Sequence, residues 1–186
     1  MGTAKKLRDR LYTHKDLEQF PEGEIWELLE GVPYQLAPPT VKHQEISGEI
    51  FNQFYNYLKG KPCKVFAAPF GVYLPDTNKR NNFIVPDITV VCDKIDGDKY
   101  MGIPSLVVEI ISPSNNEAEF IRKFKLYQTL KIKEYWIIYP NEKIVSVFKL
   151  NQNNNYELAY YTDENNKLKA GIFEDLYIDL SLIFVE

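Results

Sequence analysis

The stretch that most constrains the fold lies in the middle of the chain. Residues 105–111 (SLVVEII) are almost wholly apolar, as expected of a strand that is buried on both faces of a sheet. Residues 115–130 follow with apolar side chains at helical spacing, and residues 134–140 (EYWIIYP) form a second apolar run. A strand, a helix and a strand in this order predict a right-handed crossover unit. The chain is therefore expected to build a sheet with a helix packed against it.

The remaining segments add strands and one further long helix. Residues 41–58 carry apolar side chains at helical spacing and predict an amphipathic helix that ends at Gly60. A short helical piece is predicted after Thr13, which can act as its N-cap, and two short strands are predicted to turn at Gly31. Further strands are predicted at 64–67, 70–74, 88–92, 143–149 and 155–161. These patterns predict an α/β (α+β) fold, a mixed central β-sheet flanked by helices, in a single domain spanning residues 1–186.

Composition places the chain among ordinary globular proteins. Apolar residues make up 45% of it and charged residues 26%, and no apolar run approaches the ~20 residues needed to cross a bilayer. The N-terminus lacks the apolar core of a secretory signal. Cys63 and Cys92 follow no metal-binding spacing, so the sequence favours buried, reduced thiols and a cytoplasmic location, with no membrane partner.

The charge is unevenly distributed along the chain. The formal net charge is -4, but residues 150–186 carry seven acids against two lysines, and residues 121–133 contain five basic residues and no acid. Such a basic run is compatible with a solvated helix face. It is equally compatible with a phosphate-bearing ligand. Charge alone does not choose between the two.

Two carboxylates interrupt apolar strands. Glu109 lies within SLVVEII, and Asp87 follows Pro86 at the start of the apolar run IVPDITVV. A carboxylate in such a position has to be paired, protonated, placed at the strand end or bound to a metal. Either residue alone could cap a backbone group or pair with a basic side chain. Two of them on strands that could meet across the sheet indicate a divalent cation, and hard oxygen ligands suit Mg²⁺ or Mn²⁺.

The helix after residue 115 carries a polar stripe. Glu119, Lys123 and Tyr127 recur at i, i+4 and i+8, near the exit of the strand that carries Glu109. An ammonium beside a metal can neutralise the scissile phosphate or help to generate the attacking hydroxide. A surface Glu119–Lys123 pair, worth about 0.3–0.5 kcal/mol, is the alternative interpretation. The spacing leaves both open.

The set of motifs resembles the Uma-two family of restriction-endonuclease-like proteins, within the PD-(D/E)xK nuclease superfamily. The resemblance spans nearly the whole chain and rests on the ordered segments Trp26–Gly31, Pro86–Asp87, Val108–Glu109 with Ser112–Ser114, Lys123 with Tyr127, and Glu134–Trp136. It implies a restriction-endonuclease-like core in which Asp87 and Glu109, joined by the Ile110 carbonyl, bind the metal, and a lysine completes the catalytic set. The superfamily usually places that lysine two residues after the acid, where this chain has Ile111. Lys123 is the position that matches the family.

Four further residues are accessory candidates. Glu27 and Glu30 flank a short predicted strand, where the family tends to keep acids, and the resemblance raises Glu30 in particular as a metal-associated acid. It raises His43, where the long helix begins, as a water- or phosphate-contacting group. Exposed and capping roles are the ordinary alternatives for both. Glu119, where the family more often has Asp, and Tyr127 share the stripe of Lys123.

The sequence thus predicts a Mg²⁺- or Mn²⁺-dependent endonuclease that hydrolyses phosphodiester bonds of nucleic acid, with DNA as the expected substrate. A homodimer is expected by analogy with nucleases that cut both strands. Two other classes remain open: a nucleic-acid-binding protein that keeps the fold without the chemistry, and a homo-oligomeric interaction module built on the 24 Tyr and Phe residues. The first predicts salt-dependent binding without cleavage. The second predicts a large apolar contact.

Overall fold

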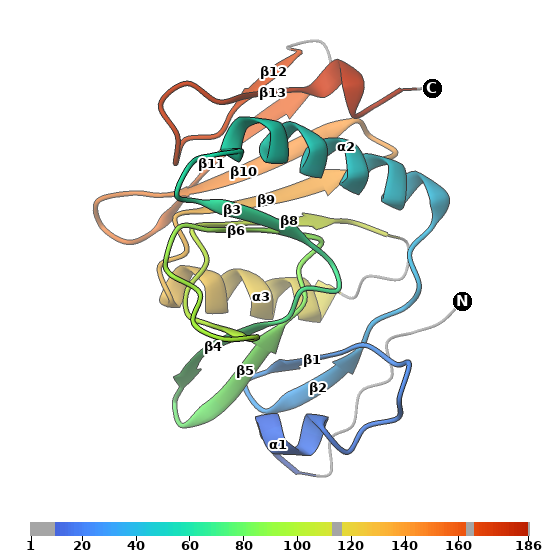
Figure 1. Cartoon of the computed structure of the whole chain (residues 1–186), viewed down its shortest axis with the longest axis vertical. Helices are drawn as coiled ribbons and strands as arrows, with labels where there is room; N and C mark the ends of the chain where they lie inside the picture. Colours follow the sequence, from blue (N-terminus) through green and yellow to red (C-terminus); the bar gives the residue numbers. More distant parts are fainter. Residues whose placement is uncertain (1–9, 113–116, 163–165, 186) are drawn as a thin grey trace.

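A computed structural model of the chain describes residues 10–112, 117–162 and 166–185. Its main body is a six-stranded sheet, and α2 and α3 lie on opposite sides of that sheet (Figure 1). The two helices span Val41–Leu58 (α2) and Glu117–Thr129 (α3). The strands of this sheet, in spatial order, are β11 (Tyr156–Thr162), β10 (Ile144–Leu150), β9 (Glu134–Tyr139), β8 (Leu106–Ile110), β6 (Ile88–Val91) and β3 (Lys64–Ala67).

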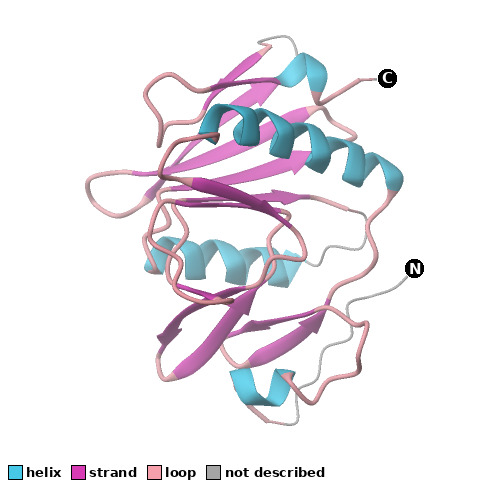
Figure 2. Cartoon of the chain, in the orientation of Figure 1, coloured by secondary structure: helices cyan, strands magenta, loops and turns pink. Residues whose placement is uncertain are grey.

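A second sheet lies below α3 in the view of Figure 1. Its order is β2 (Val32–Gln35), β1 (Trp26–Leu29), β5 (Arg80–Ile84), β4 (Val72–Thr77) and β7 (Tyr100–Met101). The short helix α1 (His14–Leu17) lies beside it, and a third sheet pairs β12 (Lys167–Lys169) with β13 (Tyr177–Asp179) next to a 3₁₀ turn at Leu180–Leu182 (Figure 2). Helices are therefore few, and strands dominate the fold.

The direction of the strands places α3 between the sheets. β8 and β9 are parallel, whereas the other pairs of the six-stranded sheet are antiparallel, so α3 is the connection that carries the chain from β8 back to the start of β9. Alternate residues of β8 point to opposite faces. Val108 and Ile110 belong to the core under α2, and Val107 belongs to the core that α3 shares with the second sheet. Glu109 has the same parity as Val107 and therefore faces α3.

Most of the predicted elements are confirmed. The long helix has the predicted bounds 41–58, and its N-cap Thr40 accepts a hydrogen bond from the His43 amide. The hairpin at Gly31 forms through two consecutive residues with positive φ, Glu30 at 49° and Gly31 at 76°. Tyr135 and Trp136 are core residues, as expected. The predicted start of the α3 helix at 115 lies outside the described residues. None of the described helices is long and apolar enough to cross a membrane.

The prediction of reduced cysteines is wrong. Cys63 and Cys92 form a disulfide, with 4.0 Å between their Cα atoms. The reason lies in the register of β3 and β6, which pairs Lys64 with Val91. One step further along this antiparallel ladder, Cys63 and Cys92 stand opposite each other. Spacing in the sequence does not disclose this proximity, because it depends on a strand pairing between segments 29 residues apart.

Candidate active site

The two intrusive carboxylates stand side by side on adjacent strands. The antiparallel register of β6 and β8 pairs Ile88 with Val108, and continuing it by one residue places Asp87 opposite Glu109. Asp87 also contacts β8 directly, because its Oδ2 accepts a hydrogen bond of 2.7 Å from the Ile110 amide. Asp87 precedes the first residue of β6, because Pro86 cannot donate to a ladder and delays the strand.

His43 meets the same carboxylate from α2. Its Nε2 lies 3.2 Å from Asp87 Oδ1, and only 11% of its side chain is exposed. The other ring nitrogen, Nδ1, is buried without a hydrogen-bond partner among the described residues. The Thr40 cap fixes the first turn of α2 and with it the direction in which this imidazole points.

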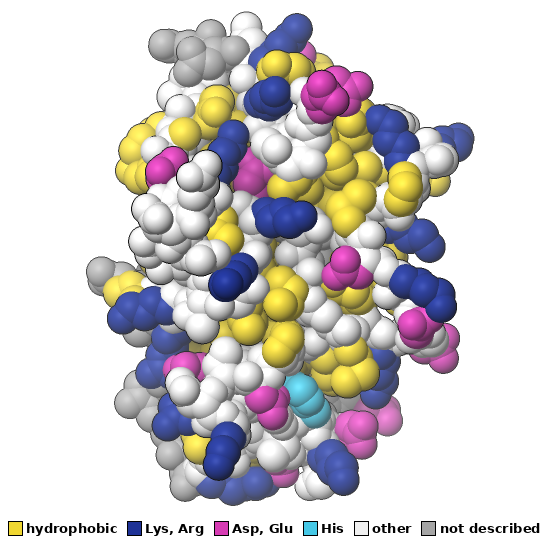
Figure 3. Space-filling model, turned by 90° about the vertical axis from the view of Figure 1, so that its left-hand side faces the viewer, with side chains coloured by type: hydrophobic (Ala, Val, Ile, Leu, Met, Phe, Trp, Pro, Cys, Tyr) yellow, Lys and Arg dark blue, Asp and Glu magenta, His cyan; other side chains and the backbone are white. Residues whose placement is uncertain are grey.

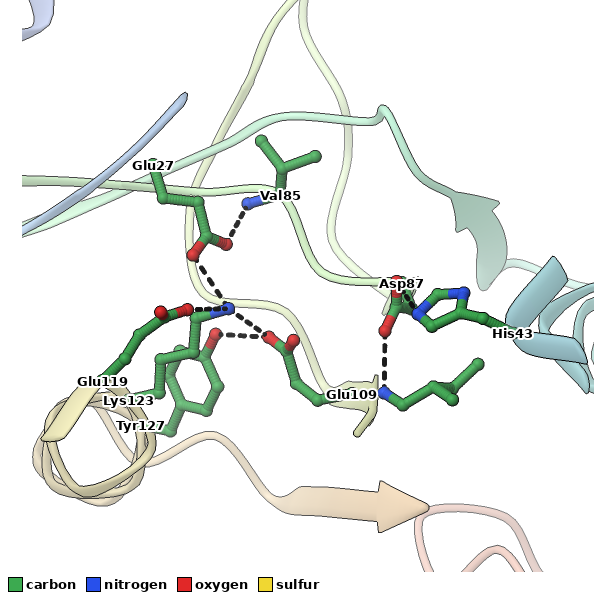
Figure 4. A network of polar contacts seen from close by, with 9 residues as sticks. Glu27, His43, Val85, Asp87, Glu109, Glu119, Lys123 and Tyr127 are labelled. Atoms are coloured by element: carbon green, nitrogen blue, oxygen red, sulfur yellow. Dashed lines mark hydrogen bonds and ion pairs between the residues drawn. The ribbon is translucent and has the colours of Figure 1, made fainter. Parts of the chain in front are cut away.

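The Lys123 side chain extends from α3, and its ammonium group contacts three carboxylates. Its Nζ lies 2.8 Å from Glu27 Oε2, 2.9 Å from Glu109 Oε1 and 3.8 Å from Glu119 Oε1 (Figure 4). Glu27 comes from β1, where it is completely buried, and its other oxygen accepts a hydrogen bond of 2.8 Å from the Val85 amide. The side chains of Lys123 and Glu119 are only 6% and 7% exposed, so the interpretation as a surface ion pair is wrong.

Tyr127, one turn after Lys123, also reaches Glu109. Its hydroxyl donates to Glu109 Oε1 over 3.1 Å, so the ammonium and the phenol contact the same oxygen. The i, i+4, i+8 stripe of α3 thus faces the sheet, and each of its three polar groups takes part in the cluster. Burial raises the pKa of Tyr127 well above its usual value, which keeps its hydroxyl protonated and able to donate.

The electrostatics of the cluster are set by an excess of carboxylates. Burial raises the pKa of Glu109 to about 8, against the lowering effect of Lys123, and the nearby Glu27 and Asp87 carboxylates add to the rise. Burial also raises the pKa of Glu119. Lys123 behaves in the opposite way: burial disfavours its charge, but Glu109, Glu27 and Glu119 together raise its pKa well above the usual value. Lys123 is therefore a fixed cation, suited to stabilising charge rather than to removing a proton.

A pocket of about 140 Å³ gives access to this cluster. Asp87, Glu109, Glu119, Lys123 and His43 line one side of it, and the loop between β2 and α2 lines the other. We call it the site pocket. Asp87 and Glu109 are the more accessible acids, with 18% and 12% of their side chains exposed, while Glu27 lies behind Lys123. The acids predicted to bind metal are thus the ones that a ligand in the pocket would meet.

The donor set fits a hard divalent cation. Two adjacent carboxylates next to a backbone carbonyl are the oxygen ligands that Mg²⁺ and Mn²⁺ prefer, with water filling the remaining positions. The described residues contain no group of three or more His, Cys, Asp or Glu side chains arranged to hold a metal. A cation here would therefore depend on Asp87, Glu109, the Ile110 carbonyl and water or substrate oxygens.

The structure brings together most of the residues that the sequence singled out, but not Glu30. Glu30 sits in the β1–β2 turn, and its described contact is a hydrogen bond from its amide to Asn82 Oδ1. Glu27, three positions earlier in the apolar segment WELL, takes the place expected for an acid from this hairpin. The sequence names Glu27 beside Glu30 but prefers Glu30. The signal that favours Glu27 is the one that found Glu109, a carboxylate inside an apolar strand.

A family model matches residues 12–181, nearly all of the described chain, under the description "Uma2: Putative restriction endonuclease". The chain belongs to the Uma2 family. Among curated proteins, this chain is similar to the Synechocystis sp. protein slr1290, with 25% identity over 153 residues that cover 80% of this chain and 79% of slr1290. A crystal structure from Anabaena variabilis, described as "a putative nuclease belonging to DUF820", superposes with a TM-score of 0.74 at 20% identity, covering 92% of this chain and 97% of its own. At that identity the superposition establishes the fold alone.

Proposed function

We propose that this Uma2 protein is a nuclease that hydrolyses phosphodiester bonds of nucleic acid, with DNA as the expected substrate. Asp87, Glu109 and the Ile110 carbonyl would hold the Mg²⁺ or Mn²⁺ ion. The observation that carries the proposal is the convergence of Asp87, Glu109 and Lys123 at one wall of the site pocket. Family membership and the fold of the Anabaena variabilis structure point in the same direction.

Each side chain has a role that follows from its contacts. The bound cation would supply a Lewis acid and a source of hydroxide at neutral pH. Lys123, held protonated by its carboxylate neighbours, would offset the negative charge that develops on the phosphate. Glu27 and Tyr127 act through others: Glu27 fixes the Lys123 ammonium, and Tyr127 fixes the Glu109 carboxylate. His43 would orient Asp87 or a water beside it.

The test is a cleavage assay with supercoiled plasmid and single-stranded oligonucleotides, with Mg²⁺, Mn²⁺ or chelator. Asp87→Asn and Lys123→Met are each expected to lower the rate by at least about 100-fold, the loss typical of one charge-stabilising group. Asp96→Asn is the matched control, because that acid is exposed and paired with Lys94. Equal cleavage by Asp87→Asn and wild type would refute the proposal.

A Mn²⁺ titration by calorimetry separates this function from its rivals. Wild type is expected to bind, and Glu109→Gln to lose most of the binding heat. A protein that binds nucleic acid without cleaving it, or a plain interaction module, predicts no difference between the two. Dimer formation and a cytoplasmic location stay predictions, and light scattering coupled to size exclusion would measure the former.

A further inference from the structure

A second pocket adjoins the site pocket and has a different character. It has a volume of about 310 Å³, within the range of small-ligand sites, and lies between α1, the start of β1 and the β4–β5 hairpin. Ile25 and Val85 line both pockets, and the consecutive residues Ala68 and Pro69 line one each. The two pockets are therefore neighbours, separated by shared walls at Ile25 and Val85.

Aromatic rings form the walls of this second pocket, which we call the aromatic pocket. Four of its lining residues are Phe20, Trp26, Tyr73 and Phe83. Phe20 stands edge-on to Trp26 with 4.8 Å between ring centroids, and Tyr73 packs at 4.7 Å on Phe83. Aromatic walls of this kind stack nucleobases, because every base presents a π-face. Phe20, Tyr73 and Phe83 are half-buried and remain accessible for such contacts.

The acidic side chains that line the aromatic pocket bear on what it can bind, and the His14 imidazole also lines it. Its lining includes two carboxylates, Glu18 and Glu24, and contains no Lys or Arg among the residues that the structure describes. Glu24 is oriented by a hydrogen bond of 2.9 Å from the Trp26 indole nitrogen. Carboxylates repel phosphate but accept hydrogen bonds from amino and imino groups. Lys99 stands at the rim, 4.0 Å from Glu18 and 5.4 Å from the Tyr73 ring, where a flanking phosphate can pass.

We infer that the aromatic pocket binds a nucleobase, guanine best, that is unstacked from the substrate strand beside the bond to be cut. The inference rests on the proposed function and extends it to the substrate: a single-stranded or unpaired nucleotide. Guanine carries imino and amino donors side by side on one edge, which match the two oxygens of a carboxylate. Cytosine and adenine offer the amino group alone, and thymine flanks its imino group with carbonyls.

The surface charge agrees with recognition through bases. Figure 3 shows one face of the molecule, on which Lys and Arg side chains are scattered among acidic and hydrophobic ones instead of forming one continuous basic field. The formal net charge is -4. On this inference, contacts to an unstacked base supply affinity that the net charge does not.

The experiment measures binding without metal, so that it does not depend on cleavage. The DNA trinucleotides TGT and TTT, and their RNA counterparts UGU and UUU, are titrated while tryptophan fluorescence is followed. Trp26 lines the pocket and Trp136 is fully buried in the other core, so TGT is expected to quench the signal and Trp26→Phe to abolish the quenching. TTT is expected to bind more weakly than TGT. Equal binding of both trinucleotides would overturn the assignment of guanine.

Variants of the pocket walls complete the test. Phe20→Leu and Tyr73→Leu are each expected to weaken TGT binding by about fivefold or more, the lower end of the effect of a stacking ring. Tyr160→Leu, on the exposed side of β11, is the matched control and should not change it. Glu18→Gln should reduce the preference for TGT over TTT, whereas Glu22→Gln, outside the pocket, should not. Thermal melts establish that each variant folds.

The outcomes distinguish this inference from the proposed function. Quenching by TGT without cleavage of any substrate would support the base pocket and refute the nuclease. Cleavage that proceeds equally on duplex and single strands, without quenching and unaffected by Phe20→Leu, would overturn the base pocket and leave the nuclease in place.

Discussion

Two regions of the molecule bury a carboxylate, and they satisfy it in different ways. Glu134, at the start of β9, is 1% exposed and receives the amides of Gly171 and Ile172, both at 3.0 Å, with Lys149 at 3.5 Å. Its partners are mostly backbone groups of one loop. A Cβ at position 171 would lie 3.1 Å from the carboxylate, so glycine permits the close approach. These hydrogen bonds connect the loop between β12 and β13 to β9 of the six-stranded sheet.

The cluster around Lys123 is built on the opposite principle. Three carboxylates share one ammonium, and Asp87 stands beside them with His43. Among the described residues, the hydrogen bonds to the Glu109 carboxylate come from the side chains of Lys123 and Tyr127, and its pKa is raised to about 8 chiefly by burial. The contrast shows that burial alone does not identify a functional carboxylate. Glu134, with backbone amides on both of its oxygens, is a structural acid, whereas we propose that the acids sharing one ammonium beside the site pocket can bind a further cation.

The largest effect is expected from removing the shared cation. Lys123→Met leaves Glu27 and Glu109 buried without their partner and should lower the free energy of unfolding by about 3–5 kcal/mol. Lys125→Met is the matched control, since that exposed lysine lies on the same helix and should stay within about 0.5 kcal/mol of wild type. Urea denaturation measures both. A Lys123→Met protein as stable as Lys125→Met would show that the buried carboxylates do not need the Lys123 ammonium for the stability of the fold.

A pH-dependent effect should come next in size. Because the pKa of Glu109 is raised from 4.5 to about 8 on folding, its contribution to stability is complete below about pH 4.5 and is lost as the pH rises through about 8. In chelator, wild-type stability should therefore fall over this interval, by at most about 1.4 kcal/mol per pH unit for one proton. Glu109→Gln should show a flatter curve. Parallel curves for the two proteins would contradict the raised pKa.

Glu134→Ala provides the other half of the comparison. Loss of the carboxylate leaves two amides without an acceptor and should cost about 2 kcal/mol, as for hydrogen bonds to a charged group. Cleavage per folded molecule and Mn²⁺ affinity should not change, because Glu134 does not line the site pocket. A loss of metal binding in this variant would remove the distinction between the two regions.

The smallest effect is expected at Glu30. Glu30→Gln should change the free energy of unfolding by less than about 0.5 kcal/mol and leave cleavage unchanged, because the described contact of Glu30 is made by its backbone. Glu27→Gln, three residues earlier, serves as the comparison and should lower both. If Glu30→Gln reduced cleavage while Glu27→Gln did not, the role in the site assigned to Glu27 would belong to Glu30 instead.

Structural features that depend on interactions within one segment can be predicted from the sequence, whereas features that depend on contacts between distant segments cannot. Periodicity located α2, β8 and β9 because helices and buried strands of that length carry their pattern within one segment. The second sheet was only partly foreseen. Its strand β5 (RNNFI) is polar at one end and holds a buried asparagine, so no apolar alternation marks it.

The candidate site shows the same division. The intrusion of Asp87 and Glu109 into apolar strands is visible in the sequence, and the stripe of Lys123 is visible as helical spacing. That Lys123 points inward, and that Glu27 meets it there, follows from the packing of α3 between two sheets. The disulfide depends in the same way on the pairing of β3 with β6. The single-domain assignment stays a prediction.

The position of Lys123 on α3 has a consequence for dynamics. In a nuclease whose lysine lay on the strand itself, the site would persist as long as the sheet did. Here the lysine belongs to a helix, and detaching that helix would separate one ammonium from the carboxylates of Glu27 and Glu109. Docking of α3 and assembly of the site are therefore one cooperative event. Hydrogen exchange of the α3 amides should report the fraction of molecules that are competent at any moment.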